Sequence, residues 1–204
     1  MLPDSATTAI IREDDYFFGV LHSRLHEIWA LRLGTWLGKG NDPRYTPTTT
    51  FETFPFPWPP GQEPGEDDPR VAAIAQWARA LVQWRDAWLN PPREGMYAGL
   101  GAAYDKLVKN RTLTNLYNGL VYYRSTRPTP YGRPGGSPLL FDRAEFDKVT
   151  RKSVTPTDIQ ELDDIHTALD TAVLNAYSWP HDLTDEQILE RLLALNLERS
   201  GREK

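Results

Sequence analysis

The stretch RYTPTTTFETFPFPWPP, residues 44–60, can form neither a long helix nor a regular central strand. Each of its five prolines removes a backbone hydrogen-bond donor and pushes the preceding residue toward extended geometry. We expect residues 48–51 to form one short edge strand, which the prolines then end. Residues 54–60, the proline strap, should run extended over the surface and lay alternating aromatic side chains on a neighbouring layer.

Before this stretch the sequence predicts a helix from Asp14 to about Gly34. Asp14 or Asp15 is available as its N-cap, and Gly34 is a typical C-terminal stop. The next segment, LGKGNDP at residues 37–43, has the composition of a turn. The apolar residues that recur at helical spacing and predict one buried stripe are Phe18, Leu21, Leu25, Ile28 and Trp29.

After the strap, the acidic segment GQEPGEDDP at residues 61–69 is the best candidate for a domain boundary. A second helix then opens with Asp68 as its cap and Pro69 at its first position. Such a helix should turn its apolar stripe toward a core. The stripe consists of Ile74, Trp77, Leu81, Trp84 and Trp88.

Two further helices are expected to close the chain. Thr155 with Pro156 begins one that keeps helical register to Tyr177, and a capping box of Thr184 and Gln187 begins the last. Residues 97–120 are compatible with helix, whereas residues 124–138 predict a long surface loop. The sequence therefore predicts a mostly α fold, a helical bundle with a short extended or β segment and a proline strap, and no complete Rossmann-like domain.

Composition limits the classes of function. The 204-residue chain has no cysteine, which excludes disulfides, thiolate metal sites and cysteine nucleophiles. No stretch has the uncharged length of a membrane span or the pattern of a signal peptide, so we expect a soluble, cytoplasmic protein without a membrane partner.

Charge is distributed unevenly along the chain, although the net charge is −5. Residues 93–157 hold 11 Lys and Arg against 5 Asp and Glu, whereas residues 158–204 hold 4 against 11. Several tyrosines lie among the central basic residues, a mixture that suits phosphate contact and base stacking. Ordinary solvated charge is the alternative explanation. From this block we select Arg111, Arg124 and Arg127 as candidate DNA contacts.

Three short motifs resemble functional signatures without completing them. NPP at residues 90–92 is similar to the loop by which amino-methyltransferases hold a base, but Arg93 stands where an aromatic is needed, and helix termination explains it better. GLGAAY at residues 99–104 lacks the preceding strand and third glycine of a cofactor turn. His22 and His26 have the i, i+4 spacing of metal pairs but no evident third ligand. We therefore predict no catalytic, cofactor or metal residue.

Three longer stretches resemble one family. They are YFFGVLHSRLHEIWALRLGTWLGKGNDPRYTPTTTFETFPFPWP (residues 16–59), RTLTNLYN (residues 111–118) and LDTAVLNAYSWPHDLTDEQILERLLALNLER (residues 169–199). Together they look like the C-terminal region of large bacterial class I SAM-dependent DNA methyltransferases, relatives of single-chain restriction-modification enzymes that methylate adenine. The likeness covers both ends of the chain well and the middle poorly.

The resemblance implies a division of the chain. Residues 1–60 would be the end of a target-recognition domain, a helix plus the extended strap. Residues 61–204 would be the C-terminal helical domain, with a basic loop-containing insertion at about residues 122–140. The strap would be the tether by which the recognition module returns to the helical part.

The resemblance also implies which residues face DNA. Arg44 and Tyr45, with Thr48 and Thr49, match the family's Arg-Tyr and the strand that follows it. Independently of the resemblance, we add the basic residue Lys39 to these candidates. The family's SAM-binding turn and catalytic loop are absent from this sequence, so SAM is expected on a separate catalytic domain.

Two functions are therefore expected from the sequence. The first is a noncatalytic DNA-recognition and scaffold portion of an adenine-specific methyltransferase, in restriction-modification or phage defence. It would bind double-stranded DNA or dock to a catalytic methyltransferase domain or chain. The second is a helical protein-interaction module without DNA contact, which an exposed tryptophan stripe would favour.

Overall fold

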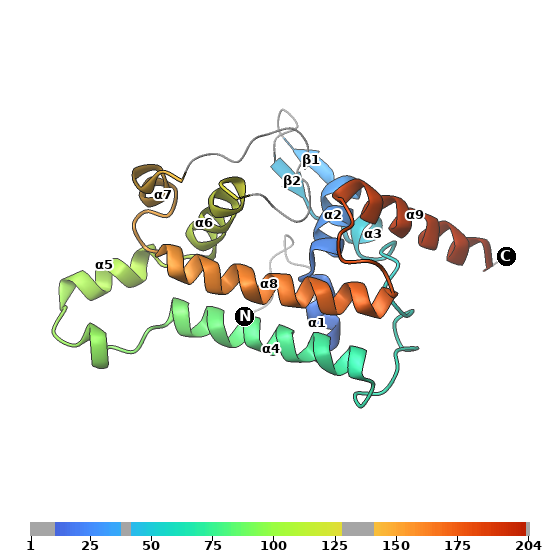
Figure 1. Cartoon of the computed structure of the whole chain (residues 1–204), viewed down its shortest axis with the longest axis horizontal. Helices are drawn as coiled ribbons and strands as arrows, with labels where there is room; N and C mark the ends of the chain where they lie inside the picture. Colours follow the sequence, from blue (N-terminus) through green and yellow to red (C-terminus); the bar gives the residue numbers. More distant parts are fainter. Residues whose placement is uncertain (1–10, 38–41, 128–140, 203–204) are drawn as a thin grey trace. The chain divides into compact units, whose positions relative to one another are not determined.

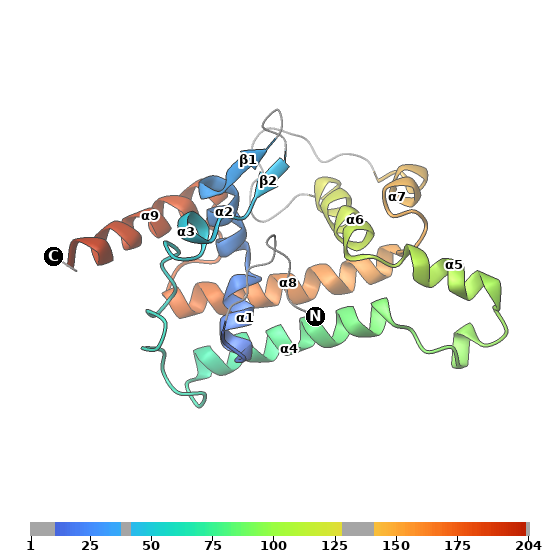
Figure 2. The same cartoon turned by 180° about the vertical axis from the view of Figure 1, so that it is seen from behind.

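A computed structural model describes residues 11–37, 42–127 and 141–202 (Figures 1 and 2). Within these ranges the chain forms nine α-helices, one 3-10 helix and a single two-stranded antiparallel sheet. The described residues therefore confirm a mostly α fold without a Rossmann-like domain. None of the helices in these ranges has both the length and the apolar stretch that a bilayer crossing requires.

The helices pack as two compact units. Residues 1–78 and 169–204 form unit 1, and residues 79–168 form unit 2. Helices α4 (Pro69–Leu89) and α8 (Pro156–Tyr177) contribute residues to both. The predicted linker, residues 61–69, lies inside unit 1, and the chain directly before and after it belongs to the same compact body.

The helix expected from Asp14 to Gly34 is two helices, α1 (Asp15–Leu21) and α2 (Arg24–Leu33). Asp14 caps α1, since its Oδ1 accepts a hydrogen bond from the Phe17 amide at 2.8 Å, and Gly34 follows the end of α2 as predicted. The break lies at Ser23, whose backbone is extended (φ −77°, ψ 156°) and whose hydroxyl donates to the Val20 carbonyl at 2.7 Å. The prediction of one continuous helix through Ser23 was therefore wrong.

The break changes which face of α1 is buried. Phe17 and Val20 are buried, whereas the predicted Phe18 and Leu21 are only half-buried. Gly19 gives α1 its close approach to the start of α4, because a Cβ there would lie 2.7 Å from Ile74 Cγ2. In this way a short helix with one glycine reaches the unit 1 core.

The proline strap is part of that core. Phe54 and Phe56 are buried, and the Phe56 ring stacks on Phe17 with centroids 4.8 Å apart. Phe54 meets the His26 ring edge-on at 4.6 Å. Trp58 is half-buried and lies 6.0 Å from the ring of Tyr16. The predicted aromatic packing of the strap is confirmed, whereas the predicted course over the surface is wrong, because residues 54–57 are buried.

Side chains of α8 and α9 (Asp185–Arg202) satisfy the strap's backbone carbonyls, which prolines leave without strand partners. The Tyr177 hydroxyl donates to the Pro55 carbonyl at 2.7 Å. Arg199 donates to the carbonyls of Phe56 at 2.6 Å and Pro57 at 3.1 Å. Because the strap cannot form a regular ladder, these bonds replace one and hold it in unit 1.

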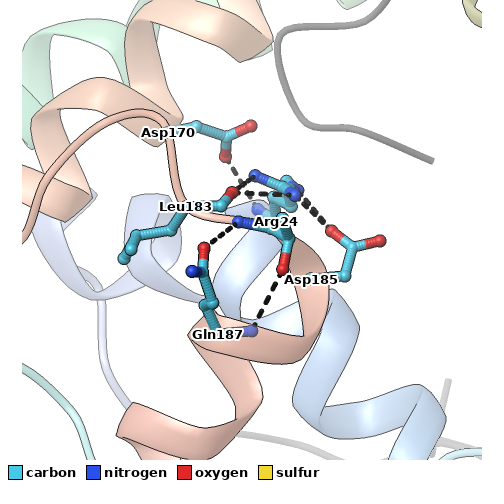
Figure 3. Close-up of polar contacts among 6 residues, drawn as sticks. Arg24, Asp170, Leu183, Asp185 and Gln187 are labelled. Atoms are coloured by element: carbon cyan, nitrogen blue, oxygen red, sulfur yellow. Dashed lines mark hydrogen bonds and ion pairs between the residues drawn. The ribbon is translucent and has the colours of Figure 1, made fainter. Parts of the chain in front are cut away.

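Arg24 joins three helices of unit 1 at the start of α2 (Figure 3). Its backbone amide donates to Asp170 Oδ1 of α8 at 2.7 Å, and Asp170 is buried. Its guanidinium donates to Asp185 Oδ1 at 2.8 Å through Nε and also reaches the Leu183 carbonyl. Since α2 also packs on α9 (Figures 1 and 2), this cluster fixes where the N-terminus of α9 begins.

Several helix starts confirm the predicted capping. The Asp68 carboxylate accepts from the Arg70 amide at 2.9 Å at the start of α4. Thr184 and Gln187 form the expected reciprocal box at α9, with distances of 2.9 and 3.3 Å. Thr155 caps α8, whose Asp158 amide donates to its hydroxyl at 3.1 Å.

Unit 2 contains η1 (Gly95–Tyr97), α5 (Ala102–Asn110), α6 (Leu113–Ser125) and α7 (Arg143–Val149) besides its parts of α4 and α8. Helix α7, which the sequence did not predict, packs on α6. Gly119 lets α6 approach α8 and the end of α7, because a Cβ there would lie 2.9 Å from Thr150 Cγ2 and 3.0 Å from Ile159 Cδ1. The predicted loop insertion falls largely on residues 128–140, outside the described residues.

Candidate nucleic-acid interface

A β-hairpin follows α2 directly and begins the candidate site. Strands β1 (Thr35–Leu37) and β2 (Asp42–Arg44) are antiparallel, with Thr35 opposite Arg44 and Trp36 opposite Pro43. The predicted turn at residues 37–43 therefore contains the hairpin loop, of which residues 38–41 lie outside the described chain. Gly34 makes the close join to α2 possible, because a Cβ there would lie 2.6 Å from the Ala30 carbonyl oxygen and 2.9 Å from that of Arg44.

The threonine run after the hairpin is a short helix, α3 (Pro47–Thr50), so the predicted edge strand at residues 48–51 is wrong. Pro47 stands at the first helical turn, where its fixed φ favours helix and its missing donor costs nothing. The buried Thr50 side chain donates to the Thr46 carbonyl at 2.7 Å. The Thr46 hydroxyl in turn lies 3.0 Å from that of Thr35, which ties α3 to β1.

Tyr45 links the hairpin to buried His26. The Tyr45 hydroxyl lies 3.0 Å from His26 Nε2, and the two rings are 5.8 Å apart. Burial lowers the pKa of His26 to about 4, so the imidazole is neutral near pH 7. Partial burial raises the pKa of Tyr45, although its hydrogen bond to Thr50 acts in the opposite direction. The phenol therefore stays protonated, held in place by a neutral ring.

The hairpin surface consists of Trp36, Arg44, Tyr45, Thr48 and Thr49. Trp36 is 50% exposed and Tyr45 40%, and the other three are exposed. By strand alternation Trp36 shares a face with Pro43, whereas Arg44 lies on the opposite face with Thr35. The hairpin thus carries the Trp36 indole on one face and the Arg44 guanidinium on the other. The hydroxyls of Thr48 and Thr49 follow in α3. Guanidinium and hydroxyl groups contact phosphates and base edges, and aromatic faces stack on bases.

Arg111, the first unit 2 candidate, binds within the protein. Its guanidinium donates to the Trp88 carbonyl at 2.6 Å and to the Tyr97 hydroxyl at 2.9 Å. The same group lies 5.1 Å from the centroid of the Trp88 ring. These contacts give Arg111 a structural role, which joins α4, η1 and the start of α6.

Arg124 and Arg127 lie at the end of α6 in different surroundings. Arg124 Nε donates to Asp163 Oδ1 at 2.6 Å, and both side chains are about a quarter exposed, at 24% and 23%. Arg127 is exposed, with its guanidinium 4.2 Å from the centroid of the Tyr123 ring. Lys39 falls outside the described residues. Of the eight candidates, four are therefore exposed residues of one segment, residues 44–49, and the three unit 2 arginines do not share an environment.

Sequence reasoning missed Trp36. The signal was present in TWL, residues 35–37, a β-branched and aromatic segment directly before a glycine-rich turn, which is typical of a hairpin strand.

The two histidines with metal-like spacing have separate contacts. His22 Nδ1 lies 3.0 Å from the Phe18 carbonyl oxygen, and its ring stacks on Phe18. His26 is buried against Tyr45 and Phe54. Across residues 11–37, 42–127 and 141–202, no group of three or more His, Asp or Glu side chains could hold a metal ion.

Comparison of the chain with protein-family models, curated proteins and solved structures gives no match.

Proposed function

We propose that the chain is a noncatalytic DNA-recognition and scaffold portion of an adenine-specific SAM-dependent DNA methyltransferase, with the hairpin surface as its contact to double-stranded DNA. The methyl-transfer step and SAM belong in this proposal to a separate catalytic domain or chain. Support comes from the three stretches that resemble this family, and above all from the geometry of residues 35–37 and 42–49.

The observation that carries the proposal is an exposed two-stranded ribbon with Arg44 on one face and Trp36 on the other. The major groove of B-DNA admits such a ribbon, and a ribbon inside a groove meets both walls. Two buried side chains fix the segment after the hairpin. His26 hydrogen-bonds the Tyr45 hydroxyl, and the Thr50 hydroxyl donates to the Thr46 carbonyl. A binding segment that is held in place by buried groups of the fold suits groove recognition.

The alternative of a helical protein-interaction module loses its main support. Within the tryptophan stripe Ile74, Leu81 and Trp88 are buried and Trp77 and Trp84 are half-buried, as in a core. This alternative now rests on α9, where Leu193 and Leu197 are 48% and 62% exposed at i, i+4 spacing. DNA binding separates the two proposals directly.

The test is fluorescence anisotropy on a mixed-sequence duplex, titrated from low to physiological salt. Wild-type binding should weaken steeply with salt. Arg44→Ala should lower the slope of log K against log salt by about 0.9 if Arg44 contacts one phosphate. Arg191→Ala, an exposed arginine of α9 in the same unit, is the matched control and should leave the slope unchanged.

Two results would overturn the proposal. If the wild-type chain binds no duplex at low salt, or if Arg44→Ala and Trp36→Ala both bind as the wild type does while remaining folded, the hairpin surface is not a DNA contact. Transfer of labelled methyl groups from SAM to DNA by this chain alone would refute its noncatalytic role.

A further inference from the structure

The turn between α7 and α8 has an unusual backbone for its sequence. Arg151 and Lys152 are consecutive residues with φ of 51° and 56°, in the left-handed region that long side chains disfavour. Glycine or asparagine would fit this conformation more easily. Arg151 and Lys152 therefore occupy a backbone conformation that is unfavourable for their side chains. Such unfavourable conformations are common at functional sites.

The turn is anchored firmly from below. Thr150 and Ser153, on either side of the pair, are buried, and each donates its hydroxyl to a backbone carbonyl, at 2.8 and 2.6 Å. The Lys152 amide donates to the Asp147 carbonyl at 2.9 Å. Arg151 and Lys152 themselves are exposed. The backbone thus fixes the position of two cations that face solvent.

The C-terminal end of α5 meets this turn. Asn110 Nδ2 donates to the Arg151 carbonyl at 3.4 Å, and a second Asn110 contact, from Asn115 to its carbonyl at 2.7 Å, holds the end of α5 on α6. Lys109 precedes Asn110, and Lys106 lies three residues earlier on the same side of the helix. Both lysines are exposed. The cation surface, defined as Lys106, Lys109, Arg151 and Lys152, thus comes from two segments about 40 residues apart.

Among the residues that the structure describes, these four cations have no carboxylate within ion-pair distance, unlike the two basic side chains of α7. Arg143 is paired with Asp147 at 2.6 Å, and Lys148 lies 3.4 Å from Glu145. Arg143 and Lys148 of α7 therefore each lie beside a carboxylate, whereas the four residues of the cation surface do not.

We propose that the cation surface binds the phosphate backbone of duplex DNA, as a second contact in unit 2 in addition to the hairpin surface. This inference rests on the proposed DNA-binding function. Lysine is a flexible point charge that suits phosphates and carries little base information, so this surface contributes affinity and salt dependence without sequence preference. The hairpin surface, with its arginine, hydroxyls and aromatic rings, is then the part that reads sequence.

The experiment compares two double variants of the full chain that remove the same charge. Arg151→Asn with Lys152→Asn removes two unpaired cations, and Arg143→Gln with Lys148→Gln removes two paired cations of the same segment. On mixed-sequence duplex DNA the first pair should lower the salt slope by about 1.8 and the second by clearly less. Because asparagine tolerates the left-handed backbone, the first pair should keep or raise the melting temperature, which separates lost contact from lost folding.

The outcomes distinguish this inference from the hairpin proposal. If Arg44→Ala lowers the slope and the Arg151→Asn, Lys152→Asn double variant does not, the DNA contact of the cation surface is refuted. The hairpin proposal is then unaffected. Equal losses in the two double variants would also refute the DNA contact of the cation surface, since they would report net charge. If the pair lowers the slope while Arg44→Ala and Trp36→Ala do not, the cation surface stands and the hairpin proposal fails. A wild-type chain that binds no duplex overturns both.

Discussion

The hydroxyl of Tyr177 donates a hydrogen bond to the carbonyl oxygen of Pro55 at 2.7 Å, although the two residues lie 122 positions apart. Burial raises the pKa of Tyr177 well above its ordinary value, so the phenol remains a donor across the accessible pH range. The carbonyl that it satisfies lies between Phe54 and Phe56, the two buried rings of the strap. This bond therefore connects the last turn of α8 to the aromatic core of unit 1.

Replacing Tyr177 with phenylalanine tests how much that bond stabilises the fold. The ring remains, but the buried Pro55 carbonyl loses its donor, which should lower the free energy of unfolding by about 1–2 kcal/mol. Urea unfolding followed by circular dichroism measures the change. Tyr122→Phe is the control, because its hydroxyl bonds the Asp142 backbone in an exposed setting and should cost under about 0.5 kcal/mol. Equal losses in the two variants would contradict the assigned role.

Arg199 offers a second test of the same clamp. Its planar guanidinium reaches two successive strap carbonyls, of Phe56 and Pro57, and a lysine ammonium does not reproduce that fork. Arg199→Lys should lower the free energy of unfolding by about 1 kcal/mol. Tyr177 and Arg199 bond adjacent carbonyls. The loss in free energy of unfolding in the double variant should therefore differ from the sum of the two single losses. Strict additivity in urea unfolding would show that the two bonds act independently.

Local signals predicted the starts of the helices well. The caps at Asp14, Asp68, Thr155 and Thr184 are all present, because capping depends on residues within one turn of each other. The prediction of a single helix from Asp14 to Gly34 was wrong because of a local interaction that the sequence does not indicate. Ser23 breaks it by donating to the Val20 carbonyl, a competition that many mid-helix serines avoid.

Long-range packing was not predictable in the same way. Proline content indicated an extended strap, but not that Tyr177 and Arg199 satisfy its carbonyls. In the candidate site, Arg44, Thr48 and Thr49 are exposed as a contact requires, whereas Arg111 is bonded to Trp88 and Tyr97. Charge counted along the sequence does not distinguish an arginine that faces solvent from one that ties three segments together.

Gly119 of α6 provides a prediction for unit 2. Alanine is normally better than glycine inside a helix by up to about 1 kcal/mol. At this position the added methyl would lie 2.9 Å from Thr150 Cγ2 and 3.0 Å from Ile159 Cδ1. We expect Gly119→Ala to lower the free energy of unfolding by about 1 kcal/mol or more, because overpacking outweighs propensity.

Gly201 is the matched control for this change. It lies in α9, and a Cβ there would meet nothing within 4 Å. Gly201→Ala should leave the thermal midpoint unchanged or raise it slightly. If Gly119→Ala raised the midpoint as well, the close approach of α6 to Ile159 would not be a packing constraint.

His26 makes stability depend on pH. Burial, with a smaller effect of the neighbouring His22, lowers its pKa to about 4, against about 6.5 in an unfolded chain. Between these values the unfolded state binds more protons than the folded state, so the free energy of unfolding falls as pH is lowered through this window. Protonation of His26 in the unfolded chain should lower the free energy of unfolding by about 3 kcal/mol between pH 7 and pH 4.

The measurement is urea unfolding of the wild type, His26→Gln and His181→Gln at several pH values between 7 and 4. Glutamine at residue 26 keeps an amide that can meet the Tyr45 hydroxyl but does not titrate, so this variant should lose about 1 kcal/mol per pH unit of the slope below pH 6. His181 is exposed, and its Nε2 lies 2.7 Å from Asn175 Oδ1, so His181→Gln is the control for the loss of a surface histidine. An unchanged slope in His26→Gln would mean that protonation of another group controls acid unfolding.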